Sequence, residues 1–297
     1  MSAFFQKIIA FFVSVVSFFY GLFGIVKPIP YAYGPHERQQ VDIVLPNNAG
    51  GSTRGVVFFI HGGAWVGGDK KDFNDYLKKT AKLGYVAAAL NYRYISDDSH
   101  CGEILDDIDA ALEKVKEVAG SKNITVEKAL LTGISAGAHL ALLYSYSRAE
   151  TAPIAPAAAV SFCGPTDLAD PGYVDGNAIG EADVMLDLLS KLCGVKLTQE
   201  EYRAQNGNYN AWIAAIEKVS PVSYVTAACV PTVIAHGEKD TIVPYANAAA
   251  LNELLTAEGV THEFVSFPNS GHELGSDPDC WDRVNELLYA YAETYLK

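Results

Sequence analysis

Residues 129–143 read ALLTGISAGAHLALL, and this stretch decides the fold. It opens with an apolar run typical of a buried strand and closes with apolar residues at helical spacing. Between them lies Ser135, with Gly133 and Gly137 two residues away on either side. A sharp turn from strand to helix needs neighbours without bulk, and the start of a helix favours negative charge that develops beside it. We therefore predict that Ser135 is a nucleophile on a strand–turn–helix unit.

The rest of the chain alternates short apolar runs with helical patterns. This alternation is typical of βαβ units and predicts an α/β fold with a mostly parallel central sheet flanked by helices. The predicted strands are Val41–Leu45, Val56–Ile60, Tyr85–Leu90, Ala129–Leu131, Ala157–Phe162, Pro231–Ala235 and His262–Phe267. The predicted helices lie near Asp72–Leu83, Glu103–Val118, Ala136–Ser147, Tyr245–Glu258 and Asp279–Tyr295.

A glycine pair follows one of these strands, in the sequence His61-Gly62-Gly63-Ala64-Trp65. Consecutive glycines leave backbone N–H groups open to a ligand, as an oxyanion hole requires. Alone, the motif is equally consistent with an ordinary turn, but its pairing with the Ser135 turn favours a catalytic role. Trp65 is a candidate substrate contact.

A nucleophilic serine needs a base, and His272 is the predicted base. It lies in Asn269-Ser270-Gly271-His272, after the last predicted strand and before the final helix, which places it at the carboxyl edge of the sheet. His139, one helical turn past Ser135, is expected to pack beneath the turn. His61 and His236 flank glycines at strand ends and are expected to be structural.

The base needs an orienting acid, and the predicted acid is Asp240. It follows the strand Pro231–Ala235 and therefore lies at the same sheet edge as Ser135 and His272. The rival is Asp167, which follows the preceding strand and is otherwise expected to cap a local turn. The chain order serine, aspartate, histidine is the order found in α/β-hydrolases.

Taken together, these motifs resemble those of the hormone-sensitive-lipase-like and bacterial feruloyl/acetyl-xylan-type carboxylesterases of the α/β-hydrolase superfamily. The resemblance implies an α/β-hydrolase fold with a helical lid, a small-molecule ester substrate, a two-step acyl transfer and no metal or organic cofactor. It also implies that the N–H groups of Gly62, Gly63 and Ala136 form the oxyanion hole. Ala64, followed by Trp65, stands where lipase-like members often carry a third glycine. This difference favours smaller esters as substrates. The matching pieces span residues 33 to 272: Tyr33-Gly34, Val41–Pro46, His61–Lys70, Asn91-Tyr92-Arg93, Gly133–Gly137, Ser220-Pro221-Val222, the Asp240 loop and Gly271-His272.

Three other functions use this kind of fold. An amidase resembling kynurenine formamidase would keep the same three catalytic residues and differ in its pocket. A peptidase of the prolyl-oligopeptidase kind usually carries a large extra domain. A non-enzymatic ligand receptor typically loses one of the three residues, whereas Ser135, Asp240 and His272 are all present.

The composition of the chain argues against some classes of binding partner. The net charge of −13 argues against nucleic acid, whose binding depends on Lys and Arg at the phosphates. The five cysteines are scattered without a C-x-x-C motif, and Ser276 breaks the H-E-x-x-H pattern that His272 would begin. Neither the cysteines nor the residues around His272 predict a metal site.

One long connection interrupts the alternation of strands and helices. Residues from about 170 to 219 include two helix-like stretches, and a connection of this length usually forms a lid or an inserted subdomain. We predict a mainly helical lid that contributes walls to the substrate pocket. Its candidate substrate contacts are Tyr202, Tyr209 and Trp212.

The first 27 residues form a separate hydrophobic segment ahead of the hydrolase domain, residues 28–297. No charged residue occurs from Ile8 to Val26, a run long enough to span a bilayer as a helix. We expect a membrane anchor, which would make the protein membrane-associated or extracytoplasmic. The alternatives are a helix docked on the domain of a cytoplasmic protein, and a cleaved signal peptide.

Overall fold

An eight-stranded sheet is the centre of the described chain, which comprises residues 28–47, 50–174 and 182–297 of a computed structural model. Strand pairing is antiparallel between β1 and β2 and between β2 and β5, and parallel across the other five strand pairs. In spatial order the strands are β1 (Ile29–Ala32), β2 (Gln40–Val44), β5 (Val86–Asn91), β4 (Val56–Ile60), β7 (Lys128–Ile134), β8 (Ala155–Phe162), β9 (Thr232–Gly237) and β10 (His262–Phe267).

The strands at the centre of the sheet are buried on both faces. All five residues of β4 are buried, with Val56, Phe58 and Ile60 in one core cluster and Val57 and Phe59 in another. Successive side chains of a strand point to opposite faces, so the two clusters lie on the two sides of the sheet. This double burial explains the continuous apolar runs in the sequence.

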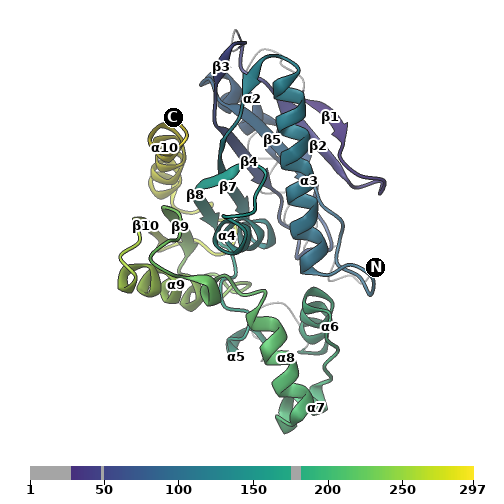
Figure 1. Cartoon of the computed structure of the whole chain (residues 1–297). Coiled ribbons are helices and arrows are strands. Elements are labelled where there is room, and N and C mark those ends of the chain that lie inside the picture. The colour runs from purple at the N-terminus through teal and green to yellow at the C-terminus, as the bar shows by residue number, and fades with distance from the viewer. Residues whose placement is uncertain (1–27, 48–49, 175–181) are drawn as a thin grey trace.

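Helices cover both faces of the sheet (Figure 1). The first face packs against α3 (Cys101–Gly120), α4 (Ala136–Ser147) and α9 (Tyr245–Ala257), whose apolar residues join the clusters of Phe58 and Ile234. The second face packs against α2 (Asn74–Lys82), which follows the short helix η1 (Lys70–Phe73), and α10 (Pro278–Tyr295).

A helical insertion occupies the chain between β8 and β9. Its helices are α5 (Pro171–Val174), α6 (Ala182–Cys193), α7 (Gln199–Ala204) and α8 (Gly207–Glu217), followed by the short helix η2 (Pro221–Tyr224). Thr198 begins α7 with a capping box, in which Glu201 Oε2 accepts a hydrogen bond from the Thr198 N–H over 2.9 Å. Figure 1 shows α6, α7 and α8 gathered together beyond one edge of the sheet.

The mostly parallel sheet flanked by helices agrees with the sequence prediction, and every predicted strand overlaps an observed one. One strand of this sheet was not among those predicted: Ile29–Ala32 pairs with β2 as an edge strand. Two short strands, β3 (Ser52–Thr53) and β6 (Ile124–Thr125), form a second small sheet. The hydrophobic segment 1–27 lies outside the described residues; within those residues no helix is long and apolar enough to cross a bilayer.

Candidate active site

Ser135 lies at a strained turn between β7 and α4. Its φ of 56° and ψ of −122° fall in a region that residues with a side chain rarely adopt. The turn is fixed from both sides, since the Ser135 N–H donates to the Phe162 carbonyl over 2.8 Å and the Ser135 carbonyl accepts from the His139 N–H over 3.0 Å. The side chain is thereby projected from the carboxyl end of β7.

The glycines around Ser135 are required by a close approach of two backbones. A Cβ atom on Gly133 would lie 2.5 Å from the carbonyl oxygen of Ile60, at the end of β4. A Cβ atom on Gly137 would lie closer still to the same oxygen. The G-x-S-x-G spacing therefore allows α4 to begin directly against β4.

Asp240 and His272 form a buried pair at the same edge of the sheet, after β9 and β10. His272 Nδ1 lies 2.7 Å from Asp240 Oδ2. The other carboxylate oxygen, Oδ1, accepts from the N–H groups of Ile242 and Val243 over 2.8 and 2.9 Å. His236 Nε2 lies 3.2 Å from Oδ2 as a further donor.

These hydrogen bonds decide the charge of Asp240. Burial alone would raise its pKa, but the hydrogen bonds and favourable charges of His236 and His272 outweigh burial and hold the pKa well below its usual value. An ionised carboxylate can only accept hydrogen bonds. His272 therefore carries a proton on Nδ1 and donates that N–H to Asp240. In the neutral ring of His272 the lone pair is therefore on Nε2.

The rival acid, Asp167, belongs to a local turn. Its Oδ1 accepts the Ala169 N–H over 3.0 Å, and its own N–H donates to Asn247 Oδ1 over 2.8 Å. Burial raises the pKa of Asp167, in contrast to the lowered pKa of Asp240. The carboxylate that accepts the hydrogen bond of His272 Nδ1 is that of Asp240.

The loop after β4 has an unusual backbone conformation. Gly63, Ala64 and Trp65 have φ values of 110°, 50° and 58°. Among the described residues, no backbone acceptor takes the N–H of Gly62 or Gly63. Ala136 is the first residue of α4, where N–H groups have no partner within the helix. The Ala136 N–H adjoins Ser135 in the chain, and the role of these three N–H groups as an oxyanion hole stays a prediction.

Comparison with known proteins gives the family. A family model described as BD-FAE matches residues 41–255. The chain belongs to the BD-FAE family. The matched segment contains the Ser135 turn, the Gly62-Gly63 loop and Asp240, and ends before His272.

Relatives of this BD-FAE chain include esterases. Esterase LipQ of Mycobacterium tuberculosis is 28% identical over 254 residues, which cover 82% of this chain and 56% of LipQ. The chain thus spans about half the length of that relative. A truncated carbohydrate esterase from gut microbiota superposes with a TM-score of 0.68 at 20% identity, covering 90% of this chain and 96% of the other. Esterase B from Lactobacillus rhamnosis gives 0.72 at 19% identity, covering 98% and 96%. These similarities show that the BD-FAE chain has the α/β-hydrolase fold.

Of the four aromatic residues predicted to contact substrate, Trp65 and Trp212 are buried in this BD-FAE chain, and Tyr202 and Tyr209 are half-buried. Trp65 is 2% exposed, and its indole N–H donates to His139 Nδ1 over 3.2 Å. This position favours a packing role over direct contact with substrate. Trp212 is fully buried in α8, and its ring lies 6.5 Å from the rings of Tyr202 and Tyr209. Contact of these three residues with substrate stays a prediction.

The sequence pattern indicated a structural role for His236 but did not predict its contact with Asp240, nor the place of Cys163 beside them. The ligand-type atoms of Cys163, His236 and Asp240 lie within 4.8 Å of one another, in a buried cluster. Asp240 accepts hydrogen bonds from His272 Nδ1 and from the N–H groups of Ile242 and Val243. His236 Nε2 lies 3.2 Å from Asp240 Oδ2 and 2.9 Å from the Val243 carbonyl, so it joins the carboxylate to the loop that follows it. The cluster is therefore explained as support for Asp240. The adjacency of His236 to Gly237 at the end of β9 was the available signal.

Proposed function

We propose that the protein is a serine carboxylesterase. The observation that carries the proposal is the 2.7 Å hydrogen bond between His272 Nδ1 and an ionised Asp240, made at the sheet edge from which Ser135 projects. Ser135, Asp240 and His272 follow β7, β9 and β10, and parallel strands bring residues at their carboxyl ends together. The esterase names of the relatives support the same reaction.

The proposed reaction has two steps. The Ser135 oxygen attacks the ester carbonyl while His272 Nε2 takes its proton, and the oxyanion accepts hydrogen bonds from the N–H groups of Gly62, Gly63 and Ala136. His272 then gives that proton to the leaving alcohol, which leaves an acyl ester on Ser135. Water then attacks the acyl ester while His272 Nε2 takes a proton from it. The bond between the acyl group and the Ser135 oxygen breaks, His272 returns the proton to that oxygen, and the acid product leaves. Asp240 holds the ring tautomer and stabilises the imidazolium.

The proposed substrates are short-chain, aryl or sugar esters. The support for small esters is Ala64, with the buried Trp65 next to it, at the position where lipase-like members often carry a third glycine. The carbohydrate esterase among the structural neighbours supports sugar esters as one class to test. A panel of aryl esters of increasing acyl length, with acetylated and feruloylated sugars, would rank these classes.

The decisive experiment is active-site labelling. A phosphonate that reacts with activated serines should modify the protein once, and peptide mass spectrometry should place the adduct on Ser135. Ser135→Ala and His272→Ala should each lower turnover by several orders of magnitude while the circular dichroism spectrum is retained, because only about 10³–10⁴-fold over water remains without the nucleophile or base. Unchanged turnover in folded Ser135→Ala would refute the proposal.

Amide hydrolysis is the alternative activity for the same catalytic residues. Its catalytic residues would be identical, and only the preferred bond would differ. Comparing kcat/KM for an aryl ester with kcat/KM for N-formylkynurenine separates the two functions. A higher value for N-formylkynurenine would assign the site to amide hydrolysis.

The helical insertion, residues 170–219, is proposed to set acyl preference. The support is its position in the chain, directly after the carboxyl end of β8. Tyr209→Leu should change the ratio of butyrate to acetate ester turnover, whereas Tyr31→Leu, in the edge strand β1, should not. An unchanged ratio in both variants would move specificity to another segment.

Residues 1–27 are proposed to attach the enzyme to a membrane. The support is the uncharged run from Ile8 to Val26. Removing residues 1–27 should leave esterase activity intact and release the enzyme from the membrane fraction. Full-length protein that stays soluble and monomeric without detergent would instead favour docking on the domain.

A further inference from the structure

We propose that Arg38 is a positioning residue for the loop after β4 that carries Gly62 and Gly63. It acts through His61, which orients the peptide between these two glycines. The proposal rests on the proposed esterase function, and Arg38 itself touches no reacting atom. It lies in the segment between β1 and β2, far in sequence from Ser135.

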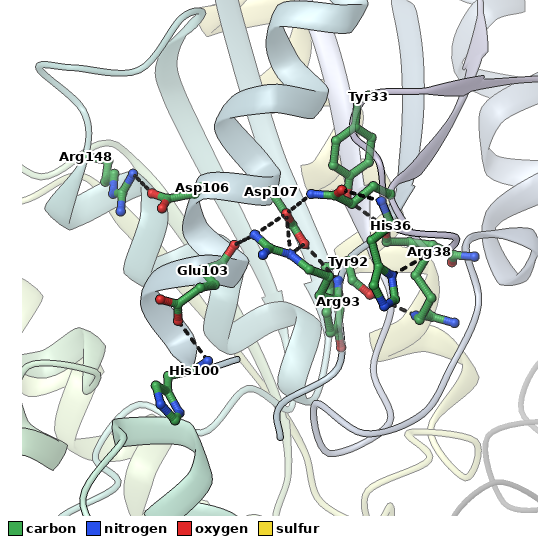
Figure 2. Close-up of polar contacts among 12 residues, drawn as sticks. Tyr33, His36, Arg38, Tyr92, Arg93, His100, Glu103, Asp106, Asp107 and Arg148 are labelled. Atoms are coloured by element: carbon green, nitrogen blue, oxygen red, sulfur yellow. Dashed lines mark hydrogen bonds and ion pairs between the residues drawn. The ribbon is translucent and has the colours of Figure 1, made fainter. Parts of the chain in front are cut away.

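The guanidinium of Arg38 is held in place by several groups. Its Nε donates to the Tyr92 carbonyl over 2.9 Å, and its Nη2 lies 3.1 Å from His61 Nε2 and 3.4 Å from the Gly68 carbonyl. The guanidinium also lies over the ring of Tyr94, 3.6 Å from the ring centre. Figure 2 shows Arg38 beside His36 and Tyr92, next to the ion pair of Arg93 and Asp107.

The chain around Arg38 is anchored as well. Gln39 Nε2 donates to Asp107 Oδ1 over 2.8 Å, and Asp107 in turn pairs with Arg93 at 2.8 Å. Asp107 is 1% exposed, so this anchor is buried in α3. The backbone of residues 38 and 39 is thus fixed relative to the end of β5.

Arg38 determines which nitrogen of His61 carries the proton. Arginine can only donate hydrogen bonds, so His61 Nε2 must accept. His61 is buried, and burial lowers its pKa to about 3, so the neutral ring has one proton, and that proton is on Nδ1. The Nδ1–H then donates to the Gly62 carbonyl, 2.7 Å away.

The orientation of the Gly62 carbonyl determines that of the Gly63 N–H. The two groups belong to one planar trans peptide and point in opposite directions. Neither Gly62 nor Gly63 has a side chain that would resist rotation of this peptide, so the His61 hydrogen bond supplies the restraint. His61 itself is held by Tyr92, whose ring stacks on it at 4.3 Å and whose hydroxyl donates to the His61 carbonyl over 3.1 Å.

Loss of the Arg38 side chain would release this restraint. The proton of His61 could then lie on Nε2, and the Nδ1 lone pair would face the Gly62 oxygen, which also carries lone pairs. This repulsion would turn the peptide and misdirect the Gly63 N–H. Weakening one oxyanion donor should lower turnover by about 10-fold, less than the loss of a complete donor.

The first test compares oxygen and sulfur substrates in Arg38→Met, Arg38→Lys and the control Arg54→Met. The Arg54 side chain is exposed and donates to the carbonyl of its neighbour Thr53, far from the Ser135 turn in the sequence. An ester carbonyl accepts oxyanion-hole hydrogen bonds better than the matched thionoester. Arg38→Met should therefore lower kcat for the ester about 10-fold with KM nearly unchanged, and should lower the ester-to-thionoester ratio of kcat/KM. Arg38→Lys should keep most of the ratio, because lysine can still donate to Nε2, and Arg54→Met should match the wild type.

The second test measures the tautomer of His61 by 15N NMR of histidine-labelled protein, with the resonance assigned from His61→Asn. The wild type should carry the proton on Nδ1, and Arg38→Met should shift it toward Nε2. The inference would be overturned by a proton on His61 Nε2 in the wild type. It would also be overturned if Arg38→Met changed neither the tautomer of His61 nor the ester-to-thionoester ratio of kcat/KM. Failure of a phosphonate to label Ser135 would overturn the esterase function, while the tautomer measurement would still decide the role of Arg38.

Discussion

The indole N–H of Trp65 donates to His139 Nδ1 across 3.2 Å, and the opposite nitrogen of the same ring, Nε2, lies 2.6 Å from the Val219 carbonyl. An indole N–H can only donate a hydrogen bond, so His139 Nδ1 must accept it and the ring proton is on Nε2. The Nε2–H then donates a hydrogen bond to the Val219 carbonyl. One fully buried ring therefore joins the loop after β4, the helix that follows Ser135 and the end of the helical insertion. This ring must be neutral for the arrangement to hold.

Stability should consequently fall in acid. Burial lowers the pKa of His139 to about 4 and that of His61 to about 3, from an ordinary value of 6.5. Below pH 6.5 the unfolded chain binds protons on these residues while the folded chain does not. Each histidine should therefore lower the free energy of unfolding by about 1 kcal/mol per pH unit between pH 6 and the folded-state pKa. Urea unfolding at pH 7, 6 and 5 measures this slope.

A matched variant isolates the contribution of His139. His139→Gln cannot titrate, so its free energy of unfolding should be lower at pH 7 but should decline less steeply toward pH 5. The difference between the two slopes should be about 1 kcal/mol per pH unit. Parallel slopes would mean that His139 is protonated in the folded protein and that its hydrogen bonds with Trp65 and Val219 are different.

The identity of the acid gives a second prediction. Asp240→Asn would place an amide against His272 Nδ1 and favour the wrong ring tautomer, so kcat should fall by about 10⁴-fold. Asp167→Asn keeps an oxygen that can accept the Ala169 N–H, so its kcat should change by a few-fold at most. Steady-state kinetics on one aryl ester, with thermal unfolding to verify folding, compares them. The reverse ranking would make Asp167 the acid.

Sequence patterns were informative where one physical requirement dominates. The strands β4, β7 and β9 are mostly buried on both faces and have largely apolar sequences, whereas the edge strand β10 is only partly buried. The turn at Ser135 needs its two glycines. The loop positions of Asp240 and His272 followed from those strands, and the structure brings the two side chains to 2.7 Å.

Other features depend on long-range contacts that no local pattern records. Strand β1 is short, contains Pro30 and leaves Ile29 54% exposed, so it lacks the signature of a strand and forms only through its pairing with β2. Arg38 reaches His61 across 23 positions, and Trp65 reaches His139 across 74. The roles predicted for residues 1–27 lie outside the described residues and stay predictions.

The strain at Ser135 gives a third prediction. A φ of 56° with a ψ of −122° is costly for any residue with a Cβ atom, by about 1–3 kcal/mol, whereas glycine adopts such angles without this penalty. Ser135→Gly and Ser135→Ala should both be inactive, but Ser135→Gly should have the higher free energy of unfolding, by about 1 kcal/mol after the entropy cost of glycine. Equal or reversed stabilities in urea would show that the turn relaxes when the serine is removed.

The close approach of α4 to β4 gives the last prediction. A Cβ atom on Gly137 would lie inside van der Waals contact with the backbone of Ile60, which cannot move without disturbing the centre of the sheet. Gly137→Ala should therefore lower the free energy of unfolding by about 3 kcal/mol. Gly120→Ala is the matched control, because Gly120 ends α3 with no atom within 4 Å of its Cβ position. Alanine has the higher helix propensity, so Gly120→Ala should be neutral or stabilising by up to about 1 kcal/mol. Similar stability changes in the two variants would mean that α4 has room to shift, and the spacing of the glycines around Ser135 would then need another explanation.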